Sequence, residues 1–411
     1  MLIIWVIHMQ NALSYLDYRK NDIHGTVQYP AMMVAPVQKD IITAIINDSH
    51  VKSLFDPFHG SGTALYEAFE INPQIRLIGC DINPLANLIT RAKLNGISEN
   101  IEDSLRLLFQ YLIIEKCKNF NFPNEEKWFR KDILKELKII RHAIMHIPCK
   151  QDRIFFWCIF SDIVRKYSNT RATTYKLHIK KESSIQNIQN KVISDYRKKI
   201  LQAIPFYKKS SNNYLLFKCD ILDLCTQIKD NEYDLTITSP PYGDNLTTVA
   251  YGQFSILALQ LIDKKDLILE GWELNNYSII DSHSMGGVAS KYYALLSEID
   301  QHYIHEIVET ISEKKQHKVR NFLADYFAFL SNISRITNKQ IVMTLGNRTV
   351  DGQIIYLNTI TSRYLQKLGW NLTKEYTRKI PRKRIPLNVS SVNNAPVQSI
   401  QLEYIDIFER K

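Results

Sequence analysis

The sequence predicts an α/β fold with a mostly parallel sheet, because two distant segments each show a short buried strand that ends abruptly at a turn. In Val51–Phe69 a strand candidate leads into a glycine-containing turn and then an apolar helix. The second segment is the β-branched run Tyr233–Thr238, which Pro240 and Pro241 stop because neither proline can donate to a strand ladder. Strands separated by helical segments form parallel sheets, whose carboxyl ends bind ligands.

The composition of the chain is that of an ordered globular protein with an excess of positive charge. The chain has 411 residues, 45% of them hydrophobic, which argues against disorder and allows a full core. Its net charge of +10 is compatible with a polyanionic partner, although surface lysines and arginines are often only solvated. The six cysteines are scattered without C-x-x-C spacing, so reduced thiols are expected, and no metal site is predicted.

The opening segment Met1–Ile7 is apolar but too short to cross a bilayer. It lacks the basic start and the small-residue cleavage site of a signal peptide. We therefore expect this segment to pack on the core as a strand or helix. A cytoplasmic protein without membrane association is the corresponding expectation.

The glycine-containing turn is Asp56-Pro57-Phe58-His59-Gly60-Ser61-Gly62-Thr63. Gly60 and Gly62 allow positive φ and a close approach of the backbone to a ligand. About twenty residues later the next strand ends at Asp81, where an acid can hold ribose hydroxyls. The turn has neither the P-loop lysine nor a third glycine, and Asp56 disfavours a pyrophosphate. S-adenosylmethionine, an adenosine with a cationic amino-acid tail, fits better.

The second motif, Ser239-Pro240-Pro241-Tyr242, forms a stiff ledge after its strand. This ledge suits alkylation of an exocyclic nucleobase amine, a poor nucleophile whose lone pair is delocalised into the ring. The Ser239 hydroxyl and the Pro240 carbonyl could accept hydrogen bonds from the amine and stabilise its developing charge. The Tyr242 ring could stack on a flipped base. Alone, the tetrapeptide is equally compatible with a proline-terminated strand before an ordinary loop.

Together the two motifs resemble the S-adenosylmethionine-dependent DNA amino-methyltransferases, which modify cytosine N4 or adenine N6. The resemblance covers roughly residues 23–95 and 214–260, and is poor elsewhere. It implies the Rossmann-like methyltransferase fold, with the cofactor motif before the catalytic motif. By position, the family's cofactor-binding residues correspond to Tyr29, Pro30, Ala31, Asp56, Phe58, Gly60, Gly62, Asp81 and Asp220, and its catalytic residues to Ser239, Pro240, Pro241 and Tyr242.

Serine at the first position of the catalytic motif is mostly found in the cytosine-N4 members, so the resemblance implies cytosine, with adenine N6 as the alternative. An RNA amino-methyltransferase and a non-catalytic nucleic-acid-binding protein remain open. The family's substrate is double-stranded DNA, and a cognate restriction endonuclease is a plausible partner by the same resemblance. No carbon-5 methylation is expected, because the chain has no Pro-Cys pair of the kind used for that reaction.

We expect the catalytic domain to consist of residues 1–95, 211–262 and 319–411. Residues 96–210 are expected to be a helical insertion that faces DNA or recognises the target, and residues 263–318 a second insertion. Within the first insertion, the basic stretch 168–181 could contact phosphates, a solvated loop being the alternative. The proline-containing basic turn 378–386 could contact phosphates or form a wall of the target pocket, a solvated hairpin being the alternative.

Overall fold

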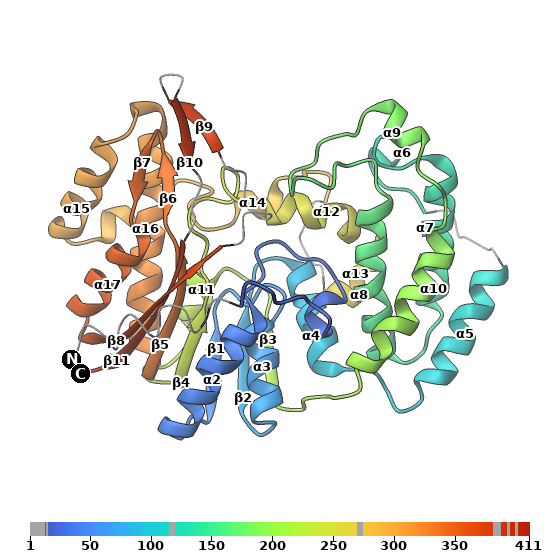
Figure 1. Ribbon diagram of the computed structural model, residues 1–411, viewed down its shortest axis with the longest axis horizontal. Coiled ribbons are helices and arrows are strands. Elements are labelled where there is room, and N and C mark those ends of the chain that lie inside the picture. The colour runs from blue at the N-terminus through green and yellow to red at the C-terminus, as the bar shows by residue number, and fades with distance from the viewer. Residues whose placement is uncertain are drawn as a thin grey trace.

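The computed structural model describes residues 13, 15–114, 120–268, 274–380, 388–392, 395–398 and 402–411. The opening segment Met1–Ile7, which was predicted to pack on the core, and residues 381–386 of the basic turn lie outside the described residues. A central sheet with helices on both faces adjoins a lobe made of helices (Figure 1).

The sheet has seven strands in the order β3-β2-β1-β4-β5-β11-β8. The strands β3, β2, β1, β4 and β5 are parallel, and β11 runs antiparallel to both of its neighbours. This confirms the predicted α/β fold with a mostly parallel sheet. The strand bounds are β1 (Ser53–Asp56), β2 (Arg76–Cys80), β3 (Tyr214–Phe217), β4 (Tyr233–Thr238), β5 (Thr337–Gly346), β8 (Trp370–Lys379) and β11 (Leu402–Arg410).

Strands β1 and β4 are neighbours and pair in parallel through Leu54 and Leu235. The strand order changes direction between them, since β2 and β3 follow on one side and β5 on the other. Such a switch point opens a crevice at the carboxyl ends of the strands. The glycine-containing turn and the proline ledge therefore leave the sheet side by side.

Both faces of the sheet are covered, and the central strands β1 and β4 are therefore buried at almost every position. Leu54 of β1 packs in one core with residues of the helices α2, α3, α4 and α12, whereas Phe55 packs in a second core with residues of α11, α16 and α17. The bounds of these helices are α2 (Ala35–Ser49), α3 (Thr63–Ile71), α4 (Pro84–Asn95), α11 (Ile221–Cys225), α12 (Tyr251–Leu261), α16 (Glu313–Ile336) and α17 (Leu357–Lys367).

The helical lobe comes from the first predicted insertion, and Figure 1 shows it beside the sheet. Its longest helix, α8, buries every residue of the run Phe155–Phe160, so this run belongs to the core. Among the described residues of 96–210, the extended pairing is limited to one isolated bridge, Thr170 with Ile179. The helices are α5 (Ile101–Ile114), α6 (Glu125–Trp128), α7 (Lys131–Met145), α8 (Lys150–Tyr167), α9 (Glu182–Gln186), α10 (Val192–Ala203) and η2 (Ile204–Phe206).

The second predicted insertion has no sharp end at residue 318, because α16 continues through that position into the core. None of the helices in the described ranges is long and apolar enough to cross a membrane. Two small antiparallel pairs, β6 with β7 and β9 with β10, complete the fold. The remaining elements are η1 (Ile23–Gly25), α13 (Lys264–Leu267), α14 (Ile279–Ser282), η3 (Tyr293–Leu295), α15 (Glu298–Glu309), β6 (Arg348–Val350), β7 (Gln353–Ile355), β9 (Asn388–Val392) and β10 (Ala395–Gln398).

Candidate active site

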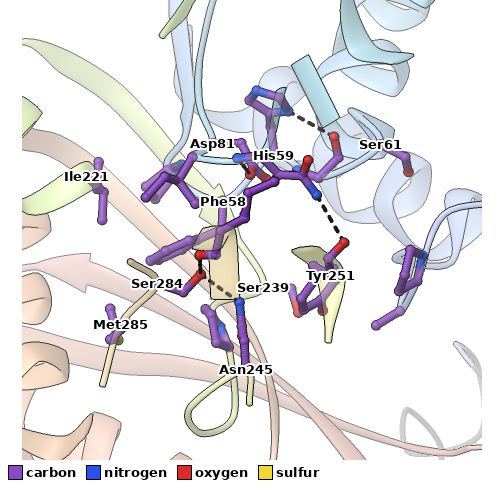
Figure 2. Close-up of a pocket in the computed structure, with 18 of the residues that line it drawn as sticks. Phe58, His59, Ser61, Asp81, Ile221, Ser239, Asn245, Tyr251, Ser284 and Met285 are labelled. Atoms are coloured by element: carbon purple, nitrogen blue, oxygen red, sulfur yellow. Dashed lines mark hydrogen bonds between the residues drawn. The ribbon is translucent and has the colours of Figure 1, made fainter. Parts of the chain in front are cut away.

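A pocket lies at the carboxyl ends of the parallel strands, where both sequence motifs leave the sheet (Figure 2). Residues from 57–63, 81–83, 219–222 and 239–245, which follow β1, β2, β3 and β4 in turn, form its floor and two of its walls. Residues from 29–33 and 280–285, with Tyr251, complete the lining. The space is about 910 Å³ when the open solvent at its mouth is included.

The two glycines of the turn have different roles. Both have positive φ, 51° at Gly60 and 71° at Gly62. Gly60 lines the pocket, and its N–H donates to Asp81 Oδ2 over 2.9 Å. Gly62 lies outside the lining, and a Cβ there would come within 2.6 Å of the Thr90 side chain. Gly62 is therefore required for packing α3 closely against α4, whereas Gly60 forms part of the pocket wall.

Asp81 is the most strongly positioned acid of the pocket wall. Its Oδ2 accepts the Gly60 N–H and its Oδ1 accepts the Asn83 N–H over 2.8 Å. Burial raises the pKa of Asp81, and these hydrogen bonds and nearby His59 oppose the shift. Each carboxylate oxygen can accept more than one hydrogen bond, so Asp81 keeps acceptor capacity for hydroxyl groups of a ligand.

Asp220, the other predicted acid of this wall, begins the helix α11 as its N-cap. Its Oδ1 accepts the Leu222 N–H over 2.8 Å, and the residue lines the pocket. Burial raises the pKa of Asp220 as well. Phe58 and Ile221 line the pocket too, and Figure 2 draws both. These residues give the wall a polar edge next to apolar surface, as a purine ring requires.

Asp56, which the sequence predicts to face the ligand, does not line the pocket. Its side chain is completely buried, and its Oδ1 accepts hydrogen bonds from Thr238 Oγ1 over 2.9 Å and from the Phe58 N–H over 3.1 Å. Burial raises the pKa of Asp56 to about 7. The carboxylate thus joins the end of β1 to the end of β4 instead of lining the cavity.

The amino-terminal element Tyr29-Pro30-Ala31 lines the opposite side of the pocket. The Tyr29 hydroxyl accepts a hydrogen bond from Asn83 Nδ2 over 3.0 Å, and the same amide donates to Ser255 Oγ over 2.8 Å. Asn83 therefore ties this element to α12. The sequence analysis missed Asn83, although an Asn-Pro pair is a recognisable start of a helix.

In the proline ledge, Ser239 and Pro241 line the pocket, whereas Pro240 and Tyr242 lie outside its lining. The Tyr242 hydroxyl is nevertheless 3.3 Å from Ser239 Oγ, and it donates to Glu403 Oε1 of β11 over 3.4 Å. A Cβ on Gly346 would come within 2.5 Å of the Tyr242 ring, so the ring packs directly on that backbone. Burial raises the pKa of Tyr242, which keeps the hydroxyl neutral.

The loop after the ledge is anchored by residues that the sequence analysis missed. Asp244 is 1% exposed and accepts a hydrogen bond from Arg348 Nη2 over 3.1 Å. Arg348 also donates to Thr247 Oγ1 over 2.7 Å. Asn245 lines the pocket and donates to Ser284 Oγ over 2.8 Å, as the dashed line in Figure 2 marks. These contacts depend on residues about 40 and 100 positions away, so local patterns give no signal for them.

His59 is a further pocket residue that was not assigned from the sequence. Asn87 donates through its amide nitrogen to the carbonyls of Asp81 and Asn83, which turns its amide oxygen toward His59 Nε2, 3.3 Å away. The other ring nitrogen, Nδ1, lies 3.1 Å from the Gly60 carbonyl oxygen, so both ring nitrogens face an acceptor. Burial lowers the pKa of His59, and the charge of Asp81 and these two contacts oppose the shift.

The described part of the chain contains no group of three or more His, Cys, Asp or Glu side chains that could hold a metal ion. The pocket wall offers hydroxyl, carboxylate, carbonyl and aromatic groups. Residues predicted to bind the cofactor and residues predicted to bind the target amine share this one cavity, since Ser239 and Asp81 both line its wall.

Comparison with known proteins gives a near full-length similarity, although no family model matches the chain. The chain is 28% identical over 421 residues to the type II methyltransferase M.MvaI of Kocuria varians. The alignment covers 95% of this chain and 91% of that protein. The chain has the α/β Rossmann-like methyltransferase fold, and this similarity supports its membership in a methyltransferase family.

Proposed function

We propose that the protein transfers a methyl group from S-adenosylmethionine to the exocyclic N4 amine of a cytosine in double-stranded DNA. The observation that carries this proposal is that Ser239 and Pro241 of the Ser-Pro-Pro-Tyr ledge line the same pocket as Asp81 and Gly60. A methyl donor held by the glycine turn and an amine held by the ledge would then meet without a large movement of the chain. The near full-length similarity to a type II methyltransferase supports the same reaction class.

The residues of the pocket fit S-adenosylmethionine. Asp81 retains acceptor capacity for the two ribose hydroxyls, since each oxygen accepts only one backbone N–H. Phe58 and Ile221 offer apolar surface to the adenine, and Asp220 offers an acceptor to its amine. The carbonyls and aromatic edge of residues 29–31 would surround the methionine end. When bound, the cofactor supplies an electrophilic methyl group activated by its sulfonium.

The ledge residues would act on the amine in three ways. Ser239 Oγ and the Pro240 carbonyl would accept its two N–H bonds, which stabilises the positive charge that develops on nitrogen during attack. The amine would then lose one proton to water. Tyr242 would fix the base by stacking, because its ring is held by Gly346 on one side and its hydroxyl by Glu403. The protein thus contributes mainly alignment and charge stabilisation.

The choice of cytosine rests on Ser239, since the resemblance associates serine at this position with cytosine-N4 enzymes. Adenine N6 is the alternative that would use the same pocket. None of the contacts described above favours an RNA amino-methyltransferase or a nucleic-acid-binding protein without activity. We further propose that the enzyme is the modification component of a restriction-modification system with a cognate endonuclease. The support for this is the type II name of its relative.

Mass spectrometry of nucleosides from DNA treated with the protein and isotopically labelled S-adenosylmethionine tests the proposal. We expect labelled N4-methylcytosine, and no label when the Ser239→Ala variant is used. Detection of labelled N6-methyladenine instead would show that adenine, and not cytosine, is the substrate. Label that enters duplex or single-stranded RNA but not DNA would refute the DNA assignment. Absence of both transfer and cofactor binding would support the non-catalytic alternative.

A further inference from the structure

A basic segment of the helical lobe reaches the loop that follows the proline ledge. From Ile163 to Lys181 the chain has six lysines and arginines and no acidic residue. Residues 168–181, which we call the basic hairpin, connect α8 to α9. In Figure 1 this green connection passes near α12, at the side of the lobe that faces the sheet.

The basic hairpin is an ordered turn-back of the chain and not an open loop. The Arg171 N–H donates to the His178 carbonyl and the Lys180 N–H to the Asn169 carbonyl, each over 2.8 Å. Thr170 and Ile179 form the isolated bridge between these bonds. Such cross-chain bonds hold the two arms at fixed spacing, so their charged side chains leave from a defined surface.

Two contacts fix the basic hairpin against the catalytic region. Lys176 Nζ donates to the Leu246 carbonyl over 3.0 Å, and the Leu177 N–H donates to Gln253 Oε1 over 3.1 Å. Leu246 belongs to the loop that begins at the Ser-Pro-Pro-Tyr ledge, and Gln253 belongs to the first turn of α12. The basic hairpin therefore borders the pocket on the side of the proposed target base.

Carboxylates balance only part of the positive charge of this region: Lys166 pairs with Asp195, and the charge of Lys176 acts on Asp281, whose pKa it lowers against the effect of burial. Among the described residues, no ion pair joins Arg165, Arg171, Lys176 or Lys180 to an acidic side chain. Arg165 instead donates to the Thr174 carbonyl over 2.7 Å and lies 5.0 Å from the centre of the Phe254 ring.

Burial lowers the pKa of Arg165 to about 10. The pKa of Lys180 is also lowered, first by burial and then by the charge of Arg165. An anion would relieve this repulsion.

Exposed groups suited to a nucleic acid lie on the same hairpin. The side chains of Arg171, His178 and Lys181 are exposed, and Tyr175 and Ile179 are 45% and 39% exposed. Cations next to exposed apolar and aromatic surface match a phosphate backbone with its sugars and bases. An acidic peptide would satisfy the charges, but the hairpin's position beside the ledge favours the polymer that carries the target base.

We propose that the basic hairpin binds the phosphodiester backbone of duplex DNA next to the nucleotide presented to Ser239. This inference rests on the proposed function for the identity of the polymer. Phosphate contacts there would set the position of the strand relative to the pocket. Contacts of this kind contribute affinity that falls with salt concentration, because each neutralised phosphate releases counterions.

The test measures how binding of the full chain to a short mixed-sequence DNA duplex depends on salt, by fluorescence anisotropy. The variant Arg171→Gln/Lys181→Gln removes two exposed cations from the basic hairpin. Lys52→Gln/Lys208→Gln is the matched control, because it removes two exposed cations near the amino ends of β1 and β3, away from the pocket. A third variant, Arg171→Lys/Lys181→Arg, keeps the charges but changes the side chains.

The hairpin variant should lower the slope of log affinity against log salt by about 2, and weaken binding on the order of tenfold or more at ~0.1 M salt. The control and the charge-conserving variant should keep the slope of the unmodified protein. An unchanged slope for the hairpin variant, or an equal loss in the charge-conserving variant, would overturn the inference. A slope change with duplex RNA but not with DNA would overturn it too.

The outcome is separable from that of the proposed function. If the unmodified protein methylates DNA while the hairpin variant keeps its slope, only the surface assignment is wrong. If the unmodified protein methylates no DNA, the proposed function is wrong, and the slopes still report whether the basic hairpin binds the polymer. In an active protein, the hairpin variant should raise KM for DNA and leave the affinity for S-adenosylmethionine unchanged.

Discussion

The two walls of the pocket are held in different ways. On the side proposed to bind the cofactor, backbone N–H groups position the acids: Gly60 and Asn83 donate to Asp81, and Leu222 donates to Asp220. On the side proposed to bind the target base, side chains from distant parts of the chain hold the Ser-Pro-Pro-Tyr ledge and the loop after it, through the contact of Tyr242 with Glu403 and of Arg348 with Asp244. The first wall is positioned once the sheet forms, whereas the second depends on two further segments of the chain.

Among the variants that test the difference between the two walls, Ser239→Ala is expected to lower kcat the most. If the target wall supplies charge stabilisation, kcat should fall by about 10²–10³, the typical loss for one such hydrogen-bonding group. Affinity for S-adenosylmethionine, measured by calorimetry, should stay unchanged because the cofactor wall is intact. Ser194→Ala, which removes an exposed hydroxyl from the helical lobe, is the control. Unchanged kcat would remove Ser239 from the chemistry.

A substitution in the wall proposed to bind the cofactor should weaken cofactor binding and leave kcat largely unchanged. Asp81→Ala should weaken binding of S-adenosylmethionine by about 10- to 100-fold, corresponding to one or two lost hydrogen bonds to a charged group. At saturating cofactor, most of kcat should remain. Asp103→Ala, which removes an exposed carboxylate on α5, serves as control. Equal affinity in calorimetry would show that Asp81 does not bind the ribose.

The difference between the two walls also explains which of their residues could be predicted from the sequence. The strand ends, the glycine turn and Asp81 follow from local spacing, because a strand, a turn and the next strand fix their relative positions. Glu403 and Arg348 could not be predicted, since they meet their partners across 161 and 104 residues. Asp56 was expected to face the ligand, whereas in the structure its carboxylate is buried outside the pocket lining. Its place in the motif gives no information on which way its buried carboxylate turns.

A smaller effect is expected from the group that holds the aromatic ring. Tyr242→Phe and Glu403→Gln should each lower kcat several-fold, less than Ser239→Ala, because they loosen the ring without removing the hydroxyl of Ser239. If the two residues act through their shared hydrogen bond, the double variant should be no worse than Tyr242→Phe. Additive losses, measured in single-turnover methyl transfer, would mean that Glu403 does not act through Tyr242.

The smallest effect on turnover is expected from Asp56, which lies outside the pocket lining but should make stability depend on pH. Its folded-state pKa is about 7, above the ordinary 3.8. As the pH rises from 3.8 to 7, the unfolded chain releases this proton and the folded chain keeps it, so stability falls across that window.

Asp56→Asn should flatten this part of the curve of thermal unfolding temperature against pH. Thr247→Val, which alters the loop after the ledge without changing any charge, should leave the shape of that curve unchanged. An equal pH dependence in Asp56→Asn and the unmodified protein would show that this carboxyl is not the group that titrates.

The central claim is that the glycine turn and the proline ledge bind the two reactants in one cavity. A crystal structure of the protein with S-adenosylhomocysteine tests this most directly. We predict that the ribose hydroxyls bind Asp81, the adenine packs on Phe58 and the sulfur faces Ser239. A cofactor bound in another part of the chain, or one whose sulfur points away from Ser239, would contradict the claim.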